Sequence, residues 1–373
     1  MFTLWVVAGD GGPLSRQLSA DADEIAAALE VLDARTDSAR VRLDGHELRL
    51  TSLNKVYWPA WRDRPAILKR DLLRYYLQIA PYVLPHLRDR PVTMRRFPNG
   101  LRGQRFYERT PQAWAPAFVQ RFVAFTENAR ADEEYFVCNN TATLVWLGQV
   151  GNLELHVAHT RIAGGRDAPG LATTFAGSLD ELQRSTLNYP DLLVTDLDPY
   201  IYSGKEPAGA EPELNRQGFA KAVQVAHWYR ELLQGIGLHP FVKTTGKTGL
   251  HLYVPITRTL EYDAVRAVAE TLARHVLAAH PRAVTTEWAV AARRGKIFLD
   301  YNMNRRAASL AAPYSPRAVD WAGVSTPLDW DELDAVYPTQ FDILNMPERL
   351  ARRGDVWQRM LDASADLSQL LGG

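Results

Sequence analysis

The segment LLVTDLDP, Leu192–Pro199, decides how the fold is interpreted, because an apolar run ends in two acidic residues. The run predicts a buried strand, and alternate residues of a strand point to the same face. Asp196 and Asp198 therefore project together at the end of the strand, where Pro199 stops it. Two neighbouring carboxylates repel each other, and a cation such as Mg²⁺ or Mn²⁺ relieves that repulsion. The alternative is a pair of loop or cap carboxylates.

A third acidic residue follows another apolar run. In KIFLDYN, Lys296–Asn302, Asp300 comes directly after three apolar residues that predict a strand. Three carboxylates at strand ends are what a two-ion site needs, with one ion activating a hydroxyl and the second, about 3.5–4 Å away, holding a triphosphate. A capping carboxylate is the alternative for Asp300 alone.

A glycine-rich turn lies between two predicted strands in KTTGKTGLHLYVP, Lys243–Pro255. Gly246 and Gly249 flank Lys247, and backbone amides freed by such a turn can bind phosphate together with the lysine. The spacing is not that of a Walker A loop, and a strand rather than a helix follows. His251 lies close enough in the sequence to reach the same phosphates, although a lone histidine is more often structural.

Composition limits the class of protein. The chain has 373 residues, 43 Lys plus Arg against 43 Asp plus Glu, and a single cysteine, Cys138. This length suits one large domain or two closely packed ones, and zero net charge leaves room for a local basic surface. One cysteine excludes an internal disulfide and a cysteine-based zinc site. The N-terminus lacks secretory signal features, and amide side chains interrupt the uncharged run Tyr135–Leu153, so we expect a cytosolic protein without a membrane span.

The order of predicted elements indicates a mixed α/β, or α+β, fold. The opening residues predict a strand at Phe2–Val7, a helix at Ala20–Leu32 and a hairpin that turns at Asp44-Gly45. A basic and aromatic region follows, with a helix opened by Pro65. That helix includes Ile67 and Leu68 and carries cations on its other face, either solvated or part of a site: Lys69, Arg70 and Arg74. Further helices are predicted at Gly218–Gln234 and Glu261–His280, further strands at Phe241–Thr245, Leu250–Ile256 and Lys296–Asn302, and a loop at Tyr200–Asn215.

Together these segments closely resemble the polymerase domain of bacterial ligase D, a member of the archaeo-eukaryotic primase superfamily. The resemblance covers about residues 45–335, and the segments occur in the order of the family. They are NKVYWP (Asn54–Pro59), RPVTMRRFPNG (Arg90–Gly100), FYER (Phe106–Arg109), LELH (Leu153–His156), TDLDP (Thr195–Pro199), TTGKTGLHLYVP (Thr244–Pro255), GKIFLDYNMN (Gly295–Asn304) and APYSPR (Ala312–Arg317).

The resemblance implies a primase-like core in a primase-polymerase domain (46–335). The residue patterns on either side predict a small N-terminal extension (1–45) and a C-terminal helical packing segment (336–373). It implies that Asp196, Asp198 and Asp300 bind two Mn²⁺ or Mg²⁺ ions and catalyse nucleotide addition. The candidates for binding the incoming ribo- or deoxynucleoside triphosphate are His156, Thr245, Lys247, His251, Arg293, Lys296 and Arg317. The candidates for binding a DNA 5′-phosphate are Lys55, Lys69, Arg95 and Tyr107, which combine cations with an aromatic ring.

The implied function is to fill gaps and extend 3′ ends during non-homologous end joining. We expect a stand-alone, cytoplasmic, nucleoid-associated polymerase that works with Ku and a separate DNA ligase. Two alternatives use the same residues differently. A non-catalytic module that binds or bridges DNA ends needs no acidic triad, and a two-metal nuclease would shorten primers instead of lengthening them.

Overall fold

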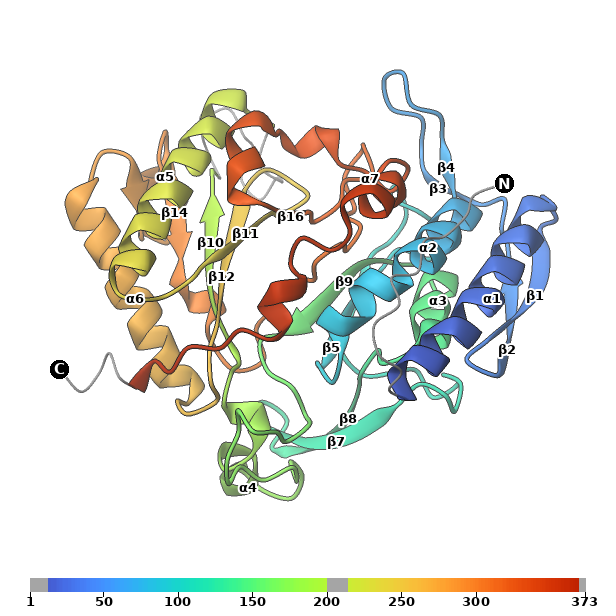
Figure 1. Ribbon diagram of the computed structural model, residues 1–373, viewed down its shortest axis with the longest axis horizontal. Helices are drawn as coiled ribbons and strands as arrows, with labels where there is room; N and C mark the ends of the chain where they lie inside the picture. Colours follow the sequence, from blue (N-terminus) through green and yellow to red (C-terminus); the bar gives the residue numbers. More distant parts are fainter. Residues whose placement is uncertain (1–12, 200–213, 369–373) are drawn as a thin grey trace.

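The computed structural model of this chain describes residues 13–199 and 214–368. Two sequence predictions lie outside these ranges, namely the strand Phe2–Val7 and most of the loop Tyr200–Asn215. The described residues combine helices with two larger sheets and three small two-stranded ones (Figure 1). The prediction of a mixed α/β, or α+β, fold is confirmed.

The larger sheet places the acidic segment near its centre. Across the sheet the strands are β13 (Val284–Thr285), β14 (Ile297–Asp300), β10 (Leu192–Asp198), β12 (Leu250–Pro255), β11 (Phe241–Thr244) and β16 (Pro327–Leu328). Strand β10 runs antiparallel to both of its neighbours, β12 and β14. Helices α5 (Arg216–Gly235) and α6 (Tyr262–Ala279) pack against this sheet (Figure 1).

The two faces of β10 have different surroundings. Leu193 and Leu197 are buried in the main hydrophobic core, which also contains side chains of α5 and α6. Val194 points to the opposite face and packs in a separate cluster with Trp357, near the C-terminal end of the chain. The two aspartates of β10 continue the row of Val194, so they lie on the face that α5 and α6 leave uncovered.

A second sheet of four strands lies beside the first (Figure 1). Its order is β15 (Ser309–Ala311), β9 (Asn152–Ala158), β5 (Val92–Arg96) and β6 (Phe106–Glu108). Helices α2 (Lys69–Leu87) and α3 (Thr141–Gln149) pack closely together next to it. A Cβ at Gly148 of α3 would lie 2.8 Å from side-chain atoms of Leu73 and Tyr76 in α2, so only glycine allows this approach.

The described part of the N-terminal unit contains the predicted helix and hairpin. Helix α1 (Pro13–Asp33) contains the predicted helical segment and begins earlier. Strands β1 (Ser38–Leu43) and β2 (His46–Thr51) form the predicted hairpin, with Val41 opposite Leu48. Asp44 and Gly45 both have positive φ, 50° and 76°, which is the backbone that a two-residue hairpin turn requires.

The helix predicted to open at Pro65 begins later, at Lys69. Ile67 and Leu68 instead form the short strand β4, which pairs with β3 (Val56–Trp58). The pairing continues when the Lys69 N–H donates to the Lys55 carbonyl at 2.8 Å. Long-range pairing with β3 therefore overrides the helical spacing of these apolar residues.

The cations at the start of α2 are not a solvated face. Lys69 and Arg70 are 4% and 7% exposed. Arg70 donates to the carbonyls of Leu32 and Thr36, both at 2.8 Å, and so joins α2 to the end of α1. Arg74 pairs with Asp33. Solvation, one of the two interpretations open from the sequence, is wrong for Lys69 and Arg70.

The remaining elements complete the fold. They are the hairpin β7 (Arg121–Thr126) and β8 (Ala131–Phe136), helices α4 (Leu179–Gln183) and α7 (Met346–Arg353), and 3₁₀ turns at Thr186–Asn188, Val290–Arg293, Tyr301–Met303, Trp330–Ala335, Pro338–Gln340 and Gln358–Leu361. The strand predicted at Lys296–Asn302 is shorter at both ends in the structure, where β14 covers Ile297–Asp300. Strand β14 stops at Asp300, because the Asp300 carboxylate accepts the Asn302 N–H at 2.9 Å and starts a 3₁₀ turn.

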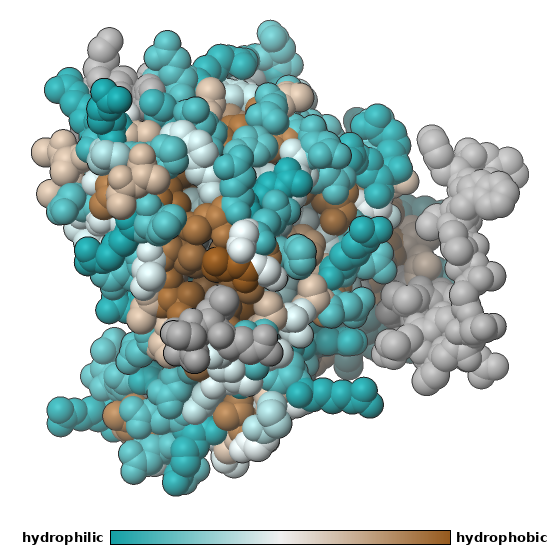
Figure 2. Space-filling model, turned by 60° about the vertical axis from the view of Figure 1, so that its left-hand side comes forward, coloured by the Kyte–Doolittle hydropathy of each residue, from teal (hydrophilic) through white to brown (hydrophobic). Residues whose placement is uncertain are grey.

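Within residues 13–199 and 214–368, no helix is both long and apolar enough to cross a membrane. The face shown in Figure 2 is mostly hydrophilic, with an apolar area near its centre.

Candidate active site

Strand pairing brings the three predicted aspartates to one face of the six-stranded sheet, on its interior strands β10 and β14, and not to a sheet edge as the sequence suggested. Asp196 is the register partner of Asp300 on β14, and Asp198 lies two residues further along β10 on the same face. Burial raises the pKa of Asp196 well above its ordinary value, and the charges of Asp198 and Asp300 raise it further. Burial also raises the pKa of Asp300, while the Asn302 N–H and Arg293 oppose that shift.

This donor set suits a divalent cation. The three carboxylates, two of which raise the pKa of the third, offer oxygen ligands and negative charge, which Mg²⁺ and Mn²⁺ prefer. Among the described residues, however, no three acidic, histidine or cysteine side chains already form a group that could hold a metal ion. The backbone therefore sets the carboxylates next to one another, and their side chains would have to turn toward a bound ion.

Buried polar side chains on the neighbouring strands β12 and β11 form a row beside Asp196. His251 on β12 is the register partner of both Asp196 and Lys243. Its Nε2 lies 3.5 Å from Asp196 Oδ1, and its Nδ1 lies 2.7 Å from Lys243 Nζ. Lys243 also donates to Ser325 Oγ. Burial lowers the pKa values of Lys243 and His251 well below their ordinary values, so both lose much of their tendency to carry charge.

The glycine-rich turn between β11 and β12 packs directly against β10. A Cβ at Gly249 would lie 2.4 Å from the Leu197 carbonyl oxygen, so the contact requires glycine. Thr245 Oγ1 accepts the N–H groups of Lys247 and Gly249 at 3.1 and 3.2 Å. The prediction that the turn leaves its amides free is therefore wrong for these two groups, because a threonine hydroxyl satisfies them within the turn.

Arg317 and His156 both lie close to the carboxylate of Glu154. Arg317 is 6% exposed and donates to the Thr245 carbonyl. His156 lies on β9 of the other sheet, and its Nε2 is 3.0 Å from Glu154 Oε2. Burial lowers the pKa of His156, and Glu154 opposes that shift.

Arg293 and Lys296 flank β14 in different ways. Arg293 is buried, donates to the carbonyls of Glu287 and Trp288, and lies close enough to Asp300 to lower the pKa of that carboxyl. Lys296 precedes β14 and donates to the Pro281 carbonyl at 2.9 Å. Asp300 ends the strand, so Lys296 and Asp300 lie at opposite ends of β14, whereas Asp198 pairs with Phe298 near its start.

The four residues predicted to bind a DNA phosphate form two neighbouring pairs, Lys55 with Lys69 and Arg95 with Tyr107. Lys55 Nζ donates to the Pro98 carbonyl at 3.1 Å, and Lys69 Nζ donates to the Thr51 carbonyl at 2.8 Å. Burial lowers the pKa of Lys69 to about 8, and the nearby charge of Lys55 adds to this effect. Arg95 and Tyr107 are register partners on β5 and β6, and the Tyr107 ring is 57% exposed.

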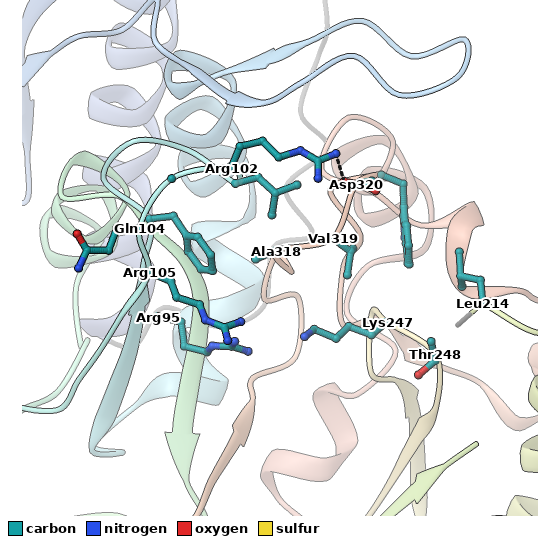
Figure 3. Close-up of a pocket in the computed structure, with 14 residues that line it drawn as sticks. Arg95, Arg102, Gln104, Arg105, Leu214, Lys247, Thr248, Ala318, Val319 and Asp320 are labelled. Atoms are coloured by element: carbon teal, nitrogen blue, oxygen red, sulfur yellow. Dashed lines mark hydrogen bonds and ion pairs between the residues drawn. The ribbon is translucent and has the colours of Figure 1, made fainter. Parts of the chain in front are cut away.

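A cavity of about 690 Å³ lies between the strands that carry Arg95 and the glycine-rich turn. In Figure 3, Arg95 and Arg105 extend from one side toward Lys247, which extends from the other. Arg102 also lines the cavity and pairs with Asp320 at its rim. The wall is therefore strongly cationic, as a phosphate-bearing ligand requires.

The sequence predictions missed two buried residues, Glu154 and Lys243. Glu154 alternates with His156 along β9, so the two share a face of the strand. Lys243 is a charge inside an apolar strand, which is rare without a buried partner. Each pattern could have identified its residue from the sequence.

The chain has the fold of a primase-polymerase domain. A solved structure, "Polymerase Domain from Mycobacterium tuberculosis Ligase D in complex with DNA", matches 85% of this chain and 99% of its own, with a TM-score of 0.70 and 28% identity. The family model of the LigD primase-polymerase domain matches residues 68–357. The chain belongs to this LigD family, which confirms the resemblance inferred from its sequence motifs.

Curated relatives agree with this assignment. The multifunctional non-homologous end joining protein LigD of Mycolicibacterium smegmatis is 29% identical over 324 residues, which is 87% of this chain and 37% of the relative. The bifunctional LigD of Bacillus subtilis is 28% identical over 310 residues, 83% of this chain and 43% of the relative. The LigD of Mycobacterium tuberculosis strain H37Rv is 31% identical over 326 residues, which is 86% of this chain and 38% of the relative. This chain therefore spans less than half the length of these relatives.

Proposed function

We propose that this chain is a metal-dependent nucleotidyltransferase that fills gaps and extends 3′ ends with ribo- or deoxynucleotides. The observation that carries the proposal is an acidic group on the face of the six-stranded sheet, next to the glycine-rich turn that lines a cationic cavity. Asp196 and Asp300 are paired in register, and Lys247 and Arg95 line the cavity from two sheets. Carboxylates suit divalent ions and cations suit phosphates, so the arrangement fits a reaction between a nucleoside triphosphate and a nucleic acid.

The metal ligands in this proposal are Asp196, Asp198 and Asp300, which would hold Mn²⁺ or Mg²⁺ in a pair of sites. Bound ions would activate the 3′-hydroxyl and neutralise the triphosphate. The chain's own residues would orient the triphosphate. With His251 Nδ1 accepting from Lys243, its Nε2 carries the proton and faces Asp196, where it can donate to a phosphate oxygen.

The nucleotide would also contact the cations that surround the glycine-rich turn. Arg317 and Lys247 supply charge, His156 supplies a ring on the opposite sheet, and Thr245 keeps the turn closed. Arg293 lies beside Asp300 and would contact the triphosphate from the far side of the acidic group. For Lys296 the support is the sequence resemblance alone.

The DNA end would bind at Lys55, Lys69, Arg95 and Tyr107. Cations neutralise a 5′-phosphate, and an exposed aromatic ring can stack on a base. The related Mycobacterium tuberculosis polymerase domain was solved with DNA, and the curated relatives are named as end-joining proteins, which supports a role at DNA ends. We therefore extend the proposal to gap filling during non-homologous end joining, with Ku and a DNA ligase as partners.

Primer extension on a short gapped duplex tests the proposal. The duplex is prepared with and without a downstream 5′-phosphate, and ribo- or deoxynucleotides are supplied with Mn²⁺ or Mg²⁺. The Asp198→Ala variant should lose at least about 100-fold in extension rate, because activation by the metal ions contributes several kcal/mol. It should still bind the DNA end. Retained extension in this variant would contradict the metal assignment.

The same assay separates the alternatives. Metal-independent binding that requires the 5′-phosphate, without incorporation, would support an end-binding module. Primers that become shorter would support a nuclease.

A further inference from the structure

The carboxylate of Glu154 is completely buried between the two proposed ligand pockets. Glu154 is 0% exposed and lies on β9, in the middle of the four-stranded sheet. A buried carboxylate is costly unless cations and hydrogen-bond donors surround it. The arrangement around its two oxygen atoms shows how this cost is offset.

The two carboxylate oxygens face different groups. Oε2 accepts from Arg95 at 2.6 Å and lies 3.0 Å from His156 Nε2. Oε1 accepts the Ala318 N–H at 2.9 Å and lies 3.4 Å from Arg317 Nε and 3.8 Å from Lys247 Nζ. Burial alone would raise the pKa of Glu154, but Arg317, His156 and Lys247 hold it well below its ordinary value. The carboxylate is therefore ionised at neutral pH.

These partners come from both proposed pockets. Arg95 is the register partner of Glu154 and belongs to the proposed DNA-end pocket. Lys247 and Arg317 belong to the proposed nucleotide pocket, and Arg317 also donates to the Thr245 carbonyl in the glycine-rich turn. One carboxylate thus links the four-stranded sheet to the turn that carries the nucleotide cations.

Glu154 gathers several cations around one carboxylate. Three permanent cations face one carboxylate, and Arg95 and Lys247 also line the cationic cavity (Figure 3). The carboxylate prevents the cations from moving apart through their mutual repulsion, so their head groups stay close together.

We propose that Glu154 is a positioning residue that holds the cationic head groups of both pockets, Arg95 for the DNA end and Lys247 with Arg317 for the nucleotide. This inference rests on the proposed function for the identity of the two ligands. Glu154 is not itself a ligand of either one, because its oxygens are fully buried and occupied by protein donors.

The proposal predicts a change in ligand affinity that is opposite in sign to the change expected from electrostatics alone. Removing a buried negative charge should by itself strengthen the binding of phosphate ligands. If Glu154 positions the cations, Glu154→Gln should instead weaken the binding of both ligands, by about tenfold each, as the loss of a supporting partner does in other sites. Substitution of Arg95 or Lys247 should affect mainly the ligand of its own pocket.

Two equilibrium binding measurements test this, and neither needs turnover. Fluorescence anisotropy gives the Kd of a labelled duplex with a recessed 5′-phosphate, and calorimetry gives the Kd of a nucleoside triphosphate with Mn²⁺. The matched control is Glu108→Gln, since Glu108 pairs with Arg96 at 2.8 Å in the same sheet and does not contact Arg95. The control should bind both ligands like the unmodified chain, and its melting temperature is measured beside that of Glu154→Gln.

Glu154→Asp covers the case in which the glutamine variant does not fold. It keeps the charge but is shorter by one carbon–carbon bond, about 1.5 Å, so it cannot hold both sets of cations. We expect weaker binding of at least one ligand. Binding of both ligands as tight as, or tighter than, in the unmodified chain, in either folded variant, would overturn the inference.

The outcomes also separate this inference from the proposed function. If the unmodified chain extends primers and the Glu154 variants bind normally, the proposed function stands and the positioning role fails. If the unmodified chain binds both ligands but never extends a primer, the polymerase proposal fails, and the binding data still decide the role of Glu154.

Discussion

Asp196 and Asp300 are register partners on the antiparallel strands β10 and β14, although they lie far apart in the sequence. The pairing forces two carboxylates into neighbouring positions, and Asp198 adds a third charge on the same face. Burial and the resulting repulsion raise the pKa of Asp196. A protein keeps such an arrangement at the expense of stability, so the effect of cations and of pH on unfolding should reveal it.

Divalent cations should stabilise the folded chain through the three aspartates. At a free Mn²⁺ concentration one hundred times the Kd, binding to the folded state adds about 2.7 kcal/mol to the free energy of unfolding. Thermal unfolding with and without Mn²⁺ measures this gain. Asp300→Asn should remove most of it, whereas Asp331→Asn, at an exposed position, should retain it. An equal gain in Asp300→Asn would place the ion elsewhere.

Without metal, the penalty at Asp196 should grow with pH. A carboxyl whose folded pKa is raised stabilises the protein below its unfolded pKa, about 3.9, and this contribution is lost as pH rises through the folded pKa. Asp196→Asn cannot ionise, so its free energy of unfolding relative to the unmodified chain should increase from pH 4 to pH 8. Denaturant unfolding in a chelator gives the difference. A difference that is constant, or that shrinks with pH, would contradict the shift.

Thr245 should matter for nucleotide binding through its hydroxyl. Thr245→Val leaves the N–H groups of Lys247 and Gly249 without their acceptor, which costs about 1–3 kcal/mol for each buried group. We expect a higher KM for the nucleotide with little change in the Kd for the DNA end. Thr245→Ser restores the hydroxyl and should restore the KM. If valine and serine behave alike, the hydroxyl is not the cause.

Tyr107 should contribute to binding of the DNA end by stacking. Its ring is exposed on β6, opposite Arg95, and the Arg109 guanidinium lies 5.5 Å from the ring centre. Tyr107→Leu should weaken end binding by about 1–3 kcal/mol, the usual contribution of one stacked base. Tyr107→Phe keeps the ring and serves as the control. Anisotropy titrations compare the two variants, and similar losses would assign the effect to the hydroxyl.

Local patterns in the sequence predicted most of the elements near the site. The alternation in Leu192–Asp198 identified a strand with two acidic residues on one face, and the Asp44-Gly45 turn identified its hairpin. These predictions hold because side-chain period and turn conformation depend on residues that are close in the chain. The helix expected to open at Pro65 exists, but its predicted start was wrong because β4 pairs with a strand that precedes it, and helical spacing does not reveal such pairing.

The sequence by itself determined the family, the acidic residues and the glycine-rich turn, because each of these is written in a short run of residues. Only the tertiary structure decided which groups meet. It paired Asp196 with Asp300, closed the turn with the Thr245 hydroxyl, and set Glu154 between Arg95 and Lys247. The pairing of Asp196 with Asp300 and the position of Glu154 depend on elements that are distant in the chain, and the pattern within one strand shows which residues share a face but not which strand lies beside it.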